Sequence, residues 1–410
     1  MSSRAAFAVV VFAFTVVMAS TTIPTPLYAL YSAKLDFGVL TTTIIFAVYA
    51  AGVVAALIIC GRWSDVVGRR PLLLAGIVLS LASALVFVTA GPVWQLIIGR
   101  VLSGVAAGIY AGTATAAVIE LAPASWRHRA PAVATAANIG GLGLGPLVAG
   151  FLAEYGPVPL HTPFVVDLVL LAAAGIGTWF ITEPVAVTSG RLSIQPLAIP
   201  DGVRGVFLRT SIAAAAGFAV MGSFSAVAPS FLSEILGVDN HAAIGCLVAA
   251  VFVCSAASQL AGRTLATDRA LIAGCATLVV GMVVLIGALA LRSIWLMVAG
   301  AVIVGVGQGL SFSKGLAALV EVTPTDKRAE VTSAFFVVAY LAISFPVVGQ
   351  GFAATEWGLY AAGLTLNIVV AVLAVLSLVS TIVASRRDNS RPHTVSEERQ
   401  PGGSMPDRRE

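Results

Sequence analysis

Long apolar runs recur along the whole chain, and they restrict its fold more than any other feature. The 410 residues contain twelve such runs, each ended by Gly, Pro or charged residues. A helix needs about 20 apolar residues to cross about 30 Å of hydrocarbon. The runs are 6–29, 40–60, 71–90, 93–121, 131–153, 163–182, 206–232, 241–262, 269–291, 294–321, 329–353 and 357–385. We therefore predict an all-α integral membrane protein with twelve transmembrane helices.

Composition separates this prediction from a membrane β-barrel. Hydrophobic residues make up 59% of the chain and the mean hydropathy is +0.99, far above the values of soluble domains. Strands of a barrel alternate apolar and polar residues, whereas residues 278–291 are apolar on every side. We keep the first run as a span rather than a cleaved signal peptide, because its apolar pattern continues to Leu30.

Lys and Arg gather in alternate loops, which predicts the orientation of the chain. By the positive-inside rule, the basic loops and both termini are cytoplasmic in a multi-pass protein of the cell (inner) membrane. The net charge of +4 then reflects topology, and we expect no nucleic-acid partner. The basic residues assigned to the inside are Arg62, Arg69, Arg70, Arg127, Arg129, Arg191, Arg204, Arg263, Arg269, Lys327, Arg328, Arg386, Arg387 and Arg391.

The residue types that carry enzyme or metal chemistry form no pattern. The cysteines lie in or at the ends of spans without metal-ligand spacing, and the histidines are scattered over loops and tail. No phosphate-binding loop or nucleophile elbow occurs either. We therefore expect no enzymatic activity, no cofactor and no metal site.

The fourth and tenth spans repeat each other at an offset of 201 residues. Gly99, Gly104, Gly108, Glu120 and Pro123 recur as Gly300, Gly305, Gly309, Glu321 and Pro324. This repeat predicts two pseudo-symmetric six-helix bundles, one of the plans of secondary transporters that bind substrate between their halves. The predicted parts are an N-terminal bundle of residues 1–182, a cytoplasmic linker 183–205, a C-terminal bundle 206–385 and a disordered cytoplasmic tail 386–410.

The loop between the second and third spans reads GRWSDVVGRR, residues 61–70. Its glycines permit tight backbone geometry. The loop resembles the one that follows the second helix in the major facilitator superfamily, although Val66 stands where a basic residue is usual. The resemblance implies the twelve-helix fold of that family and a conformational gate that latches the halves on the cytoplasmic side. The predicted gate residues are Gly61, Asp65, Gly68, Arg69 and Arg70.

Two further patterns resemble the same family. Residues 100–104, RVLSG, place Arg100 inside the fourth span, and the resemblance connects this arginine with proton coupling. An intramembrane charge indicates function by default; the alternative is an arginine that snorkels to the interface. Residues 141–150, GLGLGPLVAG, resemble the antiporter pattern of the fifth helix, with ordinary small-residue packing as the alternative. The residues of this pattern are Gly141, Gly145, Pro146 and Gly150.

The first span carries two prolines near its outer end. Pro24 and Pro26 break the helical hydrogen-bond ladder within one turn, which predicts a bend. Tyr28 and Tyr31 follow it, either as part of the substrate path or as interfacial aromatics.

Polar side chains inside the other spans are few. Asp167 is a candidate coupling acid, which we place near the outer surface within reach of water. Lys314 faces the cavity or snorkels to the cytoplasmic surface. The coupling or substrate path is predicted from Arg100, Asn138, Asp167, Lys314, Tyr28 and Tyr49.

Three functions fit these features. The first is a monomeric secondary active transporter that works by alternating access and exports small, largely apolar compounds in exchange for protons. It resembles bacterial proton-coupled efflux members of the family, although its first span carries no acidic residue. The second is an importer or exchanger of organic anions or metabolites, motivated by Arg100 and Lys314. The third is a membrane sensor or scaffold that does not transport.

Overall fold

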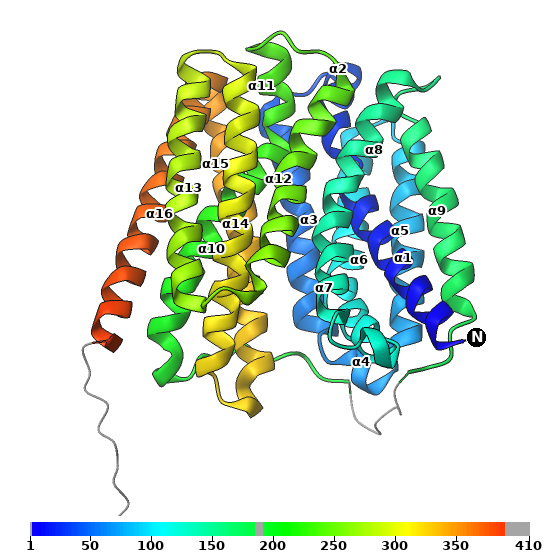
Figure 1. Ribbon diagram of the computed structural model, residues 1–410. Helices are drawn as coiled ribbons and strands as arrows, with labels where there is room; N and C mark the ends of the chain where they lie inside the picture. The colour runs from blue at the N-terminus through cyan, green and yellow to red at the C-terminus, as the bar shows by residue number, and fades with distance from the viewer. Residues whose placement is uncertain (1, 185–191, 390–410) are drawn as a thin grey trace, which may run out of the picture.

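The computed structural model describes residues 2–184 and 192–389, and every regular element in these ranges is helical. Twelve helical stretches are long and apolar enough to span a membrane. Figure 1 shows them side by side in one upright bundle. Each predicted span falls on one of them; for example, 93–121 falls on Val93–Glu120. The predicted all-α fold of twelve spans is confirmed.

The first half of the chain holds six spans, and the first of these is broken. Pro24 and Pro26 lack the backbone donors that a helix needs. The helix accordingly ends at Thr22 and resumes at Tyr28 after a 3₁₀ turn, so the α-helix is interrupted where the prolines predicted a bend. The elements are α1 (Ser3–Thr22), η1 (Thr25–Leu27), α2 (Tyr28–Leu35), α3 (Val39–Cys60), α4 (Trp63–Val66), α5 (Arg69–Val88), α6 (Val93–Glu120), η2 (Ala124–Trp126), α7 (Ala130–Thr135), the π-helical η3 (Ala136–Gly140), α8 (Gly141–Tyr155) and α9 (Thr162–Trp179).

The second half holds the other six spans. Its elements are η4 (Asp201–Val203), α10 (Arg204–Ala226), α11 (Ala228–Glu234), α12 (His241–Ala261), η5 (Gly262–Thr264), α13 (Thr267–Ala290), α14 (Ile294–Val322), η6 (Thr325–Lys327), α15 (Arg328–Trp357) and α16 (Leu359–Asn389). The last helix continues beyond the predicted end at residue 385. Part of the predicted linker, 185–191, and the tail from residue 390 lie outside the described residues.

The repeated glycines of the fourth and tenth spans serve the same packing contact. Gly104 of α6 lies against the backbone carbonyl of Tyr49 in α3, and Gly305 of α14 lies against the backbone carbonyl of Val251 in α12. A Cβ atom at either glycine would overlap that carbonyl oxygen. Small residues thus let the fourth span approach the second, and the tenth approach the eighth, in the two halves alike.

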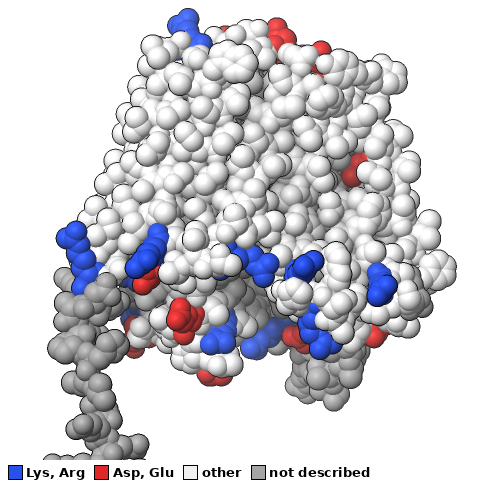
Figure 2. Space-filling model, viewed as in Figure 1, with Lys and Arg blue, Asp and Glu red and all other residues white. Residues whose placement is uncertain are grey.

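The two ends of the bundle differ in charge. Figure 2 shows most of the visible Lys and Arg side chains across the lower end of the molecule and few charges at the upper end. The loop 61–70 with α4 lies at the lower end, as do Ser3 and the last described turn of α16 (Figure 1). We call these the basic end and the sparsely charged end.

The halves meet through two helix pairs, α3 with α15 and α8 with α12. The close contacts of these pairs lie towards the sparsely charged end. Gly150 of α8 faces the carbonyl of His241 and the Cα atom of Gly245, both in α12, and Gly351 of α15 faces Thr43 of α3. The Glu154 carboxylate also accepts a hydrogen bond of 2.8 Å from the backbone N–H of His241. The structure is therefore closed at this end.

Candidate functional site

A cleft between the halves opens at the basic end. It has a volume of about 420 Å³, and both halves contribute to its wall. Figure 2 shows the surface hollowed at this end. The cleft is lined by Trp126, Arg129, Ala132, Val133 and Ala136 from the first half and by Leu260 and Arg263 from the second. A bundle that is closed at one end and has a cleft at the other has the geometry of one state of an alternating-access cycle.

Arg69 is the centre of the charged loop at the basic end. Its guanidinium binds Asp65 at 2.7 Å and Glu120 of α6 at 2.9 Å, and it also donates to the Ser64 hydroxyl. Arg70 donates to the backbone carbonyl of Trp179 in α9 at 2.5 Å. The loop thus ties the second, third, fourth and sixth spans together within the first half.

The linker also binds the loop 61–70, a contact that the sequence did not indicate. The Glu183 carboxylate accepts hydrogen bonds from the backbone N–H groups of Arg69 and Arg70, at 2.6 and 3.0 Å. A carboxylate at the first turn of α5 satisfies unpaired donors and complements the helix dipole. The backbone N–H of Gln195 donates to the carbonyl of Ile58 in α3 at 2.8 Å. Gly68, between these contacts, has a φ of 104° that favours glycine.

Replacing Asp65 by Asn is expected to increase the population that is open at the basic end, about twofold. The resemblance implies that the loop latches the halves in the opposite state, and an exposed ion pair contributes about 0.5 kcal/mol. Thiol labelling of a cysteine placed at Ala132, on the cleft wall, measures the change. Asp201→Asn, which removes an exposed ion pair with Arg204, is the control. Equal labelling of Asp65→Asn and wild type would refute the gate.

Arg100 lies deep in the first half and does not snorkel, because only 1% of its surface is exposed. Its guanidinium donates at 2.5 Å to the backbone carbonyl of Thr21, in the last turn of α1. The last carbonyls of a helix have no intrahelical donor and carry partial negative charge. Arg100 therefore caps the broken end of the first span. It also lies over the ring of Tyr49, 4.3 Å from the centroid, and near Phe46, at 5.6 Å.

The tyrosines after the bend are buried in protein. Tyr28 and Tyr31 are each 1% exposed, so the alternative that they are interfacial aromatics is wrong. Tyr28 and Tyr49 both interact electrostatically with Arg100, which brings three predicted path residues together. Tyr31 donates to the carbonyl of Phe87 in α5 at 3.1 Å.

The glycines of α8 contact two different partners. Gly141 and Gly145 face α1: a Cβ atom at Gly141 would lie 2.8 Å from the Thr15 carbonyl, and one at Gly145 would overlap the Ala19 carbonyl. Gly150 faces α12 in the other half. Pro146 lies inside α8, which stays helical after the π-helical segment η3. The predicted pattern thus joins the broken first span to the seam between the halves.

The environment of Asp167 differs from the prediction. Asp167 was expected near the surface within reach of water, but it is 2% exposed and its carboxylate accepts a hydrogen bond of 2.7 Å from Ser20 in α1. The stacked rings of Phe87 and Phe164, with centroids 5.0 Å apart, lie one helical turn closer to the sparsely charged end. Asp167 is therefore buried where its distance along the helix predicted access to water.

Lys314 is buried, and its ammonium is bound by backbone carbonyls. It is 7% exposed, and its ammonium donates to the carbonyls of Leu265 at 2.7 Å and Arg263 at 3.3 Å, both at the end of η5. The lysine thus ties α14 to the loop after the eighth span, and its place in the substrate path stays a prediction. Asn138 is half-buried in η3, which packs against α1 and α12.

The second half presents aromatic rings from α10, α14 and α15. Phe218 lies 5.1 Å from Phe312, and Phe312 lies 5.9 Å from Phe336, measured between ring centroids. Tyr340 lies 6.2 Å from Phe218, measured between ring centroids. These rings, which sequence reasoning missed, form an aromatic cluster inside the second half.

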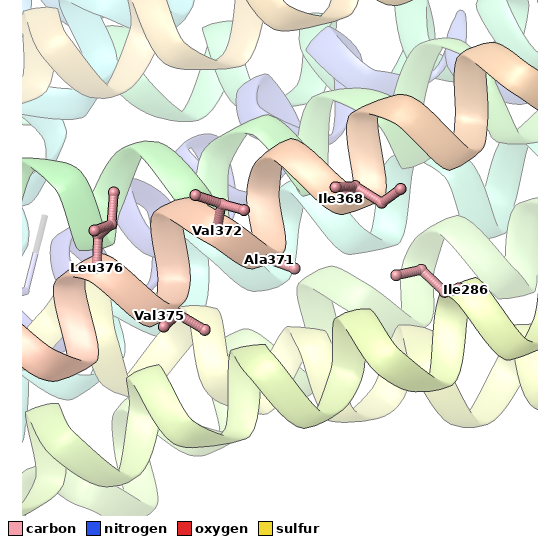
Figure 3. A pocket seen from close by; sticks show the side chains of 6 residues that line it. All are labelled: Ile286, Ile368, Ala371, Val372, Val375 and Leu376. Carbon is pink, nitrogen blue, oxygen red and sulfur yellow. The ribbon is translucent and has the colours of Figure 1, made fainter.

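A second cavity of about 310 Å³ lies between α13 and α16. Figure 3 shows its lining residues on these two helices, and all of them are aliphatic: Ile286, Ile368, Ala371, Val372, Val375 and Leu376. Ile368, Val372 and Leu376 are about half exposed. An aliphatic groove of this kind fits lipid chains, so we do not assign it to the transport site.

Two repeated helical halves with a cleft between them define the class of secondary transporters. The sequence matches the Major Facilitator Superfamily over residues 10–347 and again over 212–404. The chain belongs to this family, as the loop 61–70 and the fourth and fifth spans indicated. Within the described residues no three His, Cys, Asp or Glu side chains gather to hold a metal ion.

Curated relatives match part of the chain. It is 31% identical to the class D tetracycline resistance protein of Salmonella ordonez over 145 residues, 35% of this chain and 36% of the relative. It is 29% identical to multidrug resistance protein MdtG of Dickeya zeae (strain Ech586) over 202 residues, 47% of each chain. The chain thus spans less than half the length of these relatives in the aligned regions.

Solved structures share the fold at low identity. A bacterial homologue of the human lysosomal transporter Spinster, in an inward-facing and unoccupied conformation, has a TM-score of 0.70 and 15% identity, covering 94% of this chain and 97% of its own. A POT family transporter in complex with 5-aminolevulinic acid has a TM-score of 0.72 and 15% identity, covering 93% and 96%. These likenesses concern the fold.

Proposed function

We propose that this transporter exports small, largely apolar compounds in exchange for protons, by alternating access. The observation that carries the proposal is the cleft at the basic end, between halves that are held together by close glycine contacts at the other end. With the basic loops in the cytoplasm, the cleft admits compounds from inside the cell. The relatives are named as tetracycline and multidrug resistance proteins, which supports export.

We infer the substrate class from two side-chain clusters, one in each half. The rings of Phe218, Phe312 and Phe336 favour planar apolar compounds by burial and stacking. The Arg100 guanidinium is the only charge in the cluster of Tyr28, Phe46 and Tyr49. Such a site suits a compound that is mostly apolar and has one polar edge.

Transport into and out of proteoliposomes tests this function. Tetracycline and a panel of planar apolar compounds are loaded for counterflow, with and without an imposed pH gradient. We expect saturable exchange of at least one compound, and accumulation only when the gradient is present. A panel that shows no exchange by the purified chain would exclude the proposed substrate class, and exchange that ignores the gradient would exclude proton coupling.

Arg100 also favours a second candidate, the transport of organic anions. The guanidinium is buried without an ion pair among the described residues, and its Nε atom and the Tyr28 hydroxyl have no hydrogen-bond partner there. A carboxylate would satisfy such donors. Lys314 does not add to this case, because backbone carbonyls already bind it. Exchange of aromatic carboxylates, but not of neutral analogues, would favour this candidate over the first.

A further inference from the structure

Only two acidic side chains are buried within the described residues, and they differ in their partners. Glu330, 7% exposed, lies 3.3 Å from the Lys327 ammonium at the basic end. Asp167, 2% exposed, has the Ser20 hydroxyl as its hydrogen-bond partner and no cation. An ionised carboxylate in an apolar environment without a cation is strongly disfavoured. Ionisation of Asp167 therefore requires water to reach it.

The helices around Asp167 bring no charge close to it. It is the sixth residue of α9, about 8 Å along the helix from its first residue. Helices α5, α1 and α8 pack against α9. Their titratable side chains are Arg4 at the start of α1, Arg69 and Arg70 at the start of α5, and Glu154 and Tyr155 in the last turn of α8. The first three lie at the basic end, Glu154 binds His241, and Tyr155 is 72% exposed.

Three consecutive residues of α1 connect Asp167 to the rest of the site. Ser20 donates to Asp167 of α9, the Thr21 carbonyl accepts from Arg100 of α6, and the Thr22 hydroxyl donates to the carbonyl of Leu142 in α8 at 2.9 Å. This turn directly precedes the break at Pro24. A displacement of the turn therefore acts on the arginine cluster and on the glycine-rich helix at once.

We propose that Asp167 carries the proton that is exchanged for the exported compound, and that Ser20 transmits its ionisation to the break in the first span. This inference rests on the proposed function. When a compound enters through the cleft at the basic end, water that enters with it reaches Asp167. The O–H bond of the carboxyl breaks, the proton passes to this water and leaves on the cytoplasmic side, and the electron pair stays on the carboxylate oxygen. Protonation stabilises the conformation described here, because the site is dry. A proton taken up from outside then returns the empty carrier to the state that is open at the basic end.

Spin labels across the cleft test the proposal without a substrate. The four native cysteines are replaced by Ser, and labels are attached at Ala132→Cys and Leu260→Cys, which lie on opposite walls of the cleft. The distance between them is measured in lipid nanodiscs from acidic to alkaline pH. We expect the open distance to dominate at acidic pH and a shorter, closed distance to gain population as the pH rises.

Variants of Asp167 and of Ser20 distinguish the group that carries the proton from the group that transmits its ionisation. Asp167→Asn is expected to keep the open distance at every pH, and Asp167→Glu to keep a pH-dependent change. Ser20→Ala is expected to reduce the change, and Ser20→Thr to restore it. The control is Glu356→Gln, which replaces an exposed acid in the last turn of α15. This variant should respond to pH as wild type does. The proposal would be overturned if the label distance in Asp167→Asn changed with pH as it does in wild type, or if it did not change with pH in wild type.

The experiments distinguish failure of the Asp167 proposal from failure of the proposed export function. If the chain exchanges no compound in proteoliposomes but the cleft still closes with pH through Asp167, the substrate class is wrong and the coupling acid stands. If tetracycline accumulates with a pH gradient in both wild type and Asp167→Asn, export stands and another group carries the proton.

Discussion

Replacing Arg100 by Ala is expected to reduce the initial rate of counterflow by more than tenfold. Without the guanidinium, the Thr21 carbonyl at the end of α1 is left without a donor in a dry environment, which costs about 1–3 kcal/mol. The stacking of Arg100 on Tyr49 is also lost, at about 0.5–2 kcal/mol. Together these terms amount to about 1.5–5 kcal/mol in favour of other arrangements of the broken span.

The conservative variant sharpens this prediction. Arg100→Lys keeps the charge but lacks the planar, multi-donor head that can bind a carbonyl and stack on a ring together, so we expect an intermediate rate. Lys34→Ala removes an exposed cation after the same broken span and should transport normally. Size-exclusion profiles and melting temperatures of all variants exclude unfolding as the cause. Wild-type transport by Arg100→Ala would show that capping of α1 is dispensable.

The spans were predictable because a bilayer leaves the backbone little choice. Each segment must satisfy its own hydrogen bonds in hydrocarbon, so an apolar run of sufficient length becomes a helix, as 40–60 became Val39–Cys60. The break at Thr22 was equally predictable, because the missing donors of Pro24 and Pro26 are a local property. The predicted gate residues were also selected from local spacing, and their role stays a prediction.

The environments of the site residues were not predictable in this way. In a membrane protein the faces that meet lipid and the faces that meet other helices are both apolar, so hydropathy does not reveal how a side chain is oriented. Asp167 seemed accessible from its place near a helix end, yet it is buried and bound by Ser20 of another helix. Lys314 found carbonyl partners 49 and 51 residues away in the chain.

The contact of the linker with the gate loop shows the same limit. Glu183 binds backbone groups 113 and 114 residues earlier, and nothing in its local sequence marks it as a helix cap. The aromatic cluster of Phe218, Phe312 and Phe336 was missed for a related reason. Its members come from three helices, and nothing in the local sequence distinguishes them from other apolar side chains of the spans.

Replacing Gly150 by Leu is expected to open the sparsely charged end and to slow transport at least fivefold. A Cβ atom at Gly150 would lie 2.5 Å from the His241 carbonyl and 3.0 Å from the Gly245 Cα atom, both in the other half. These are backbone atoms of a helix and cannot yield like the end of a side chain. Overpacking of this kind costs about 1–3 kcal/mol, which separation of the halves relieves.

The closed seam between the halves is thus set by the absence of a side chain at one position. Thr43→Cys, at a buried position that faces Gly351 across the same seam, reports opening by its reaction with an impermeant thiol reagent. We expect faster labelling in Gly150→Leu than in the matched variant Gly112→Leu, whose Cβ would meet no atom within 4 Å. Equal labelling of the two would mean that the halves tolerate a side chain at this contact, and that tight packing of α8 on α12 does not hold the sparsely charged end closed.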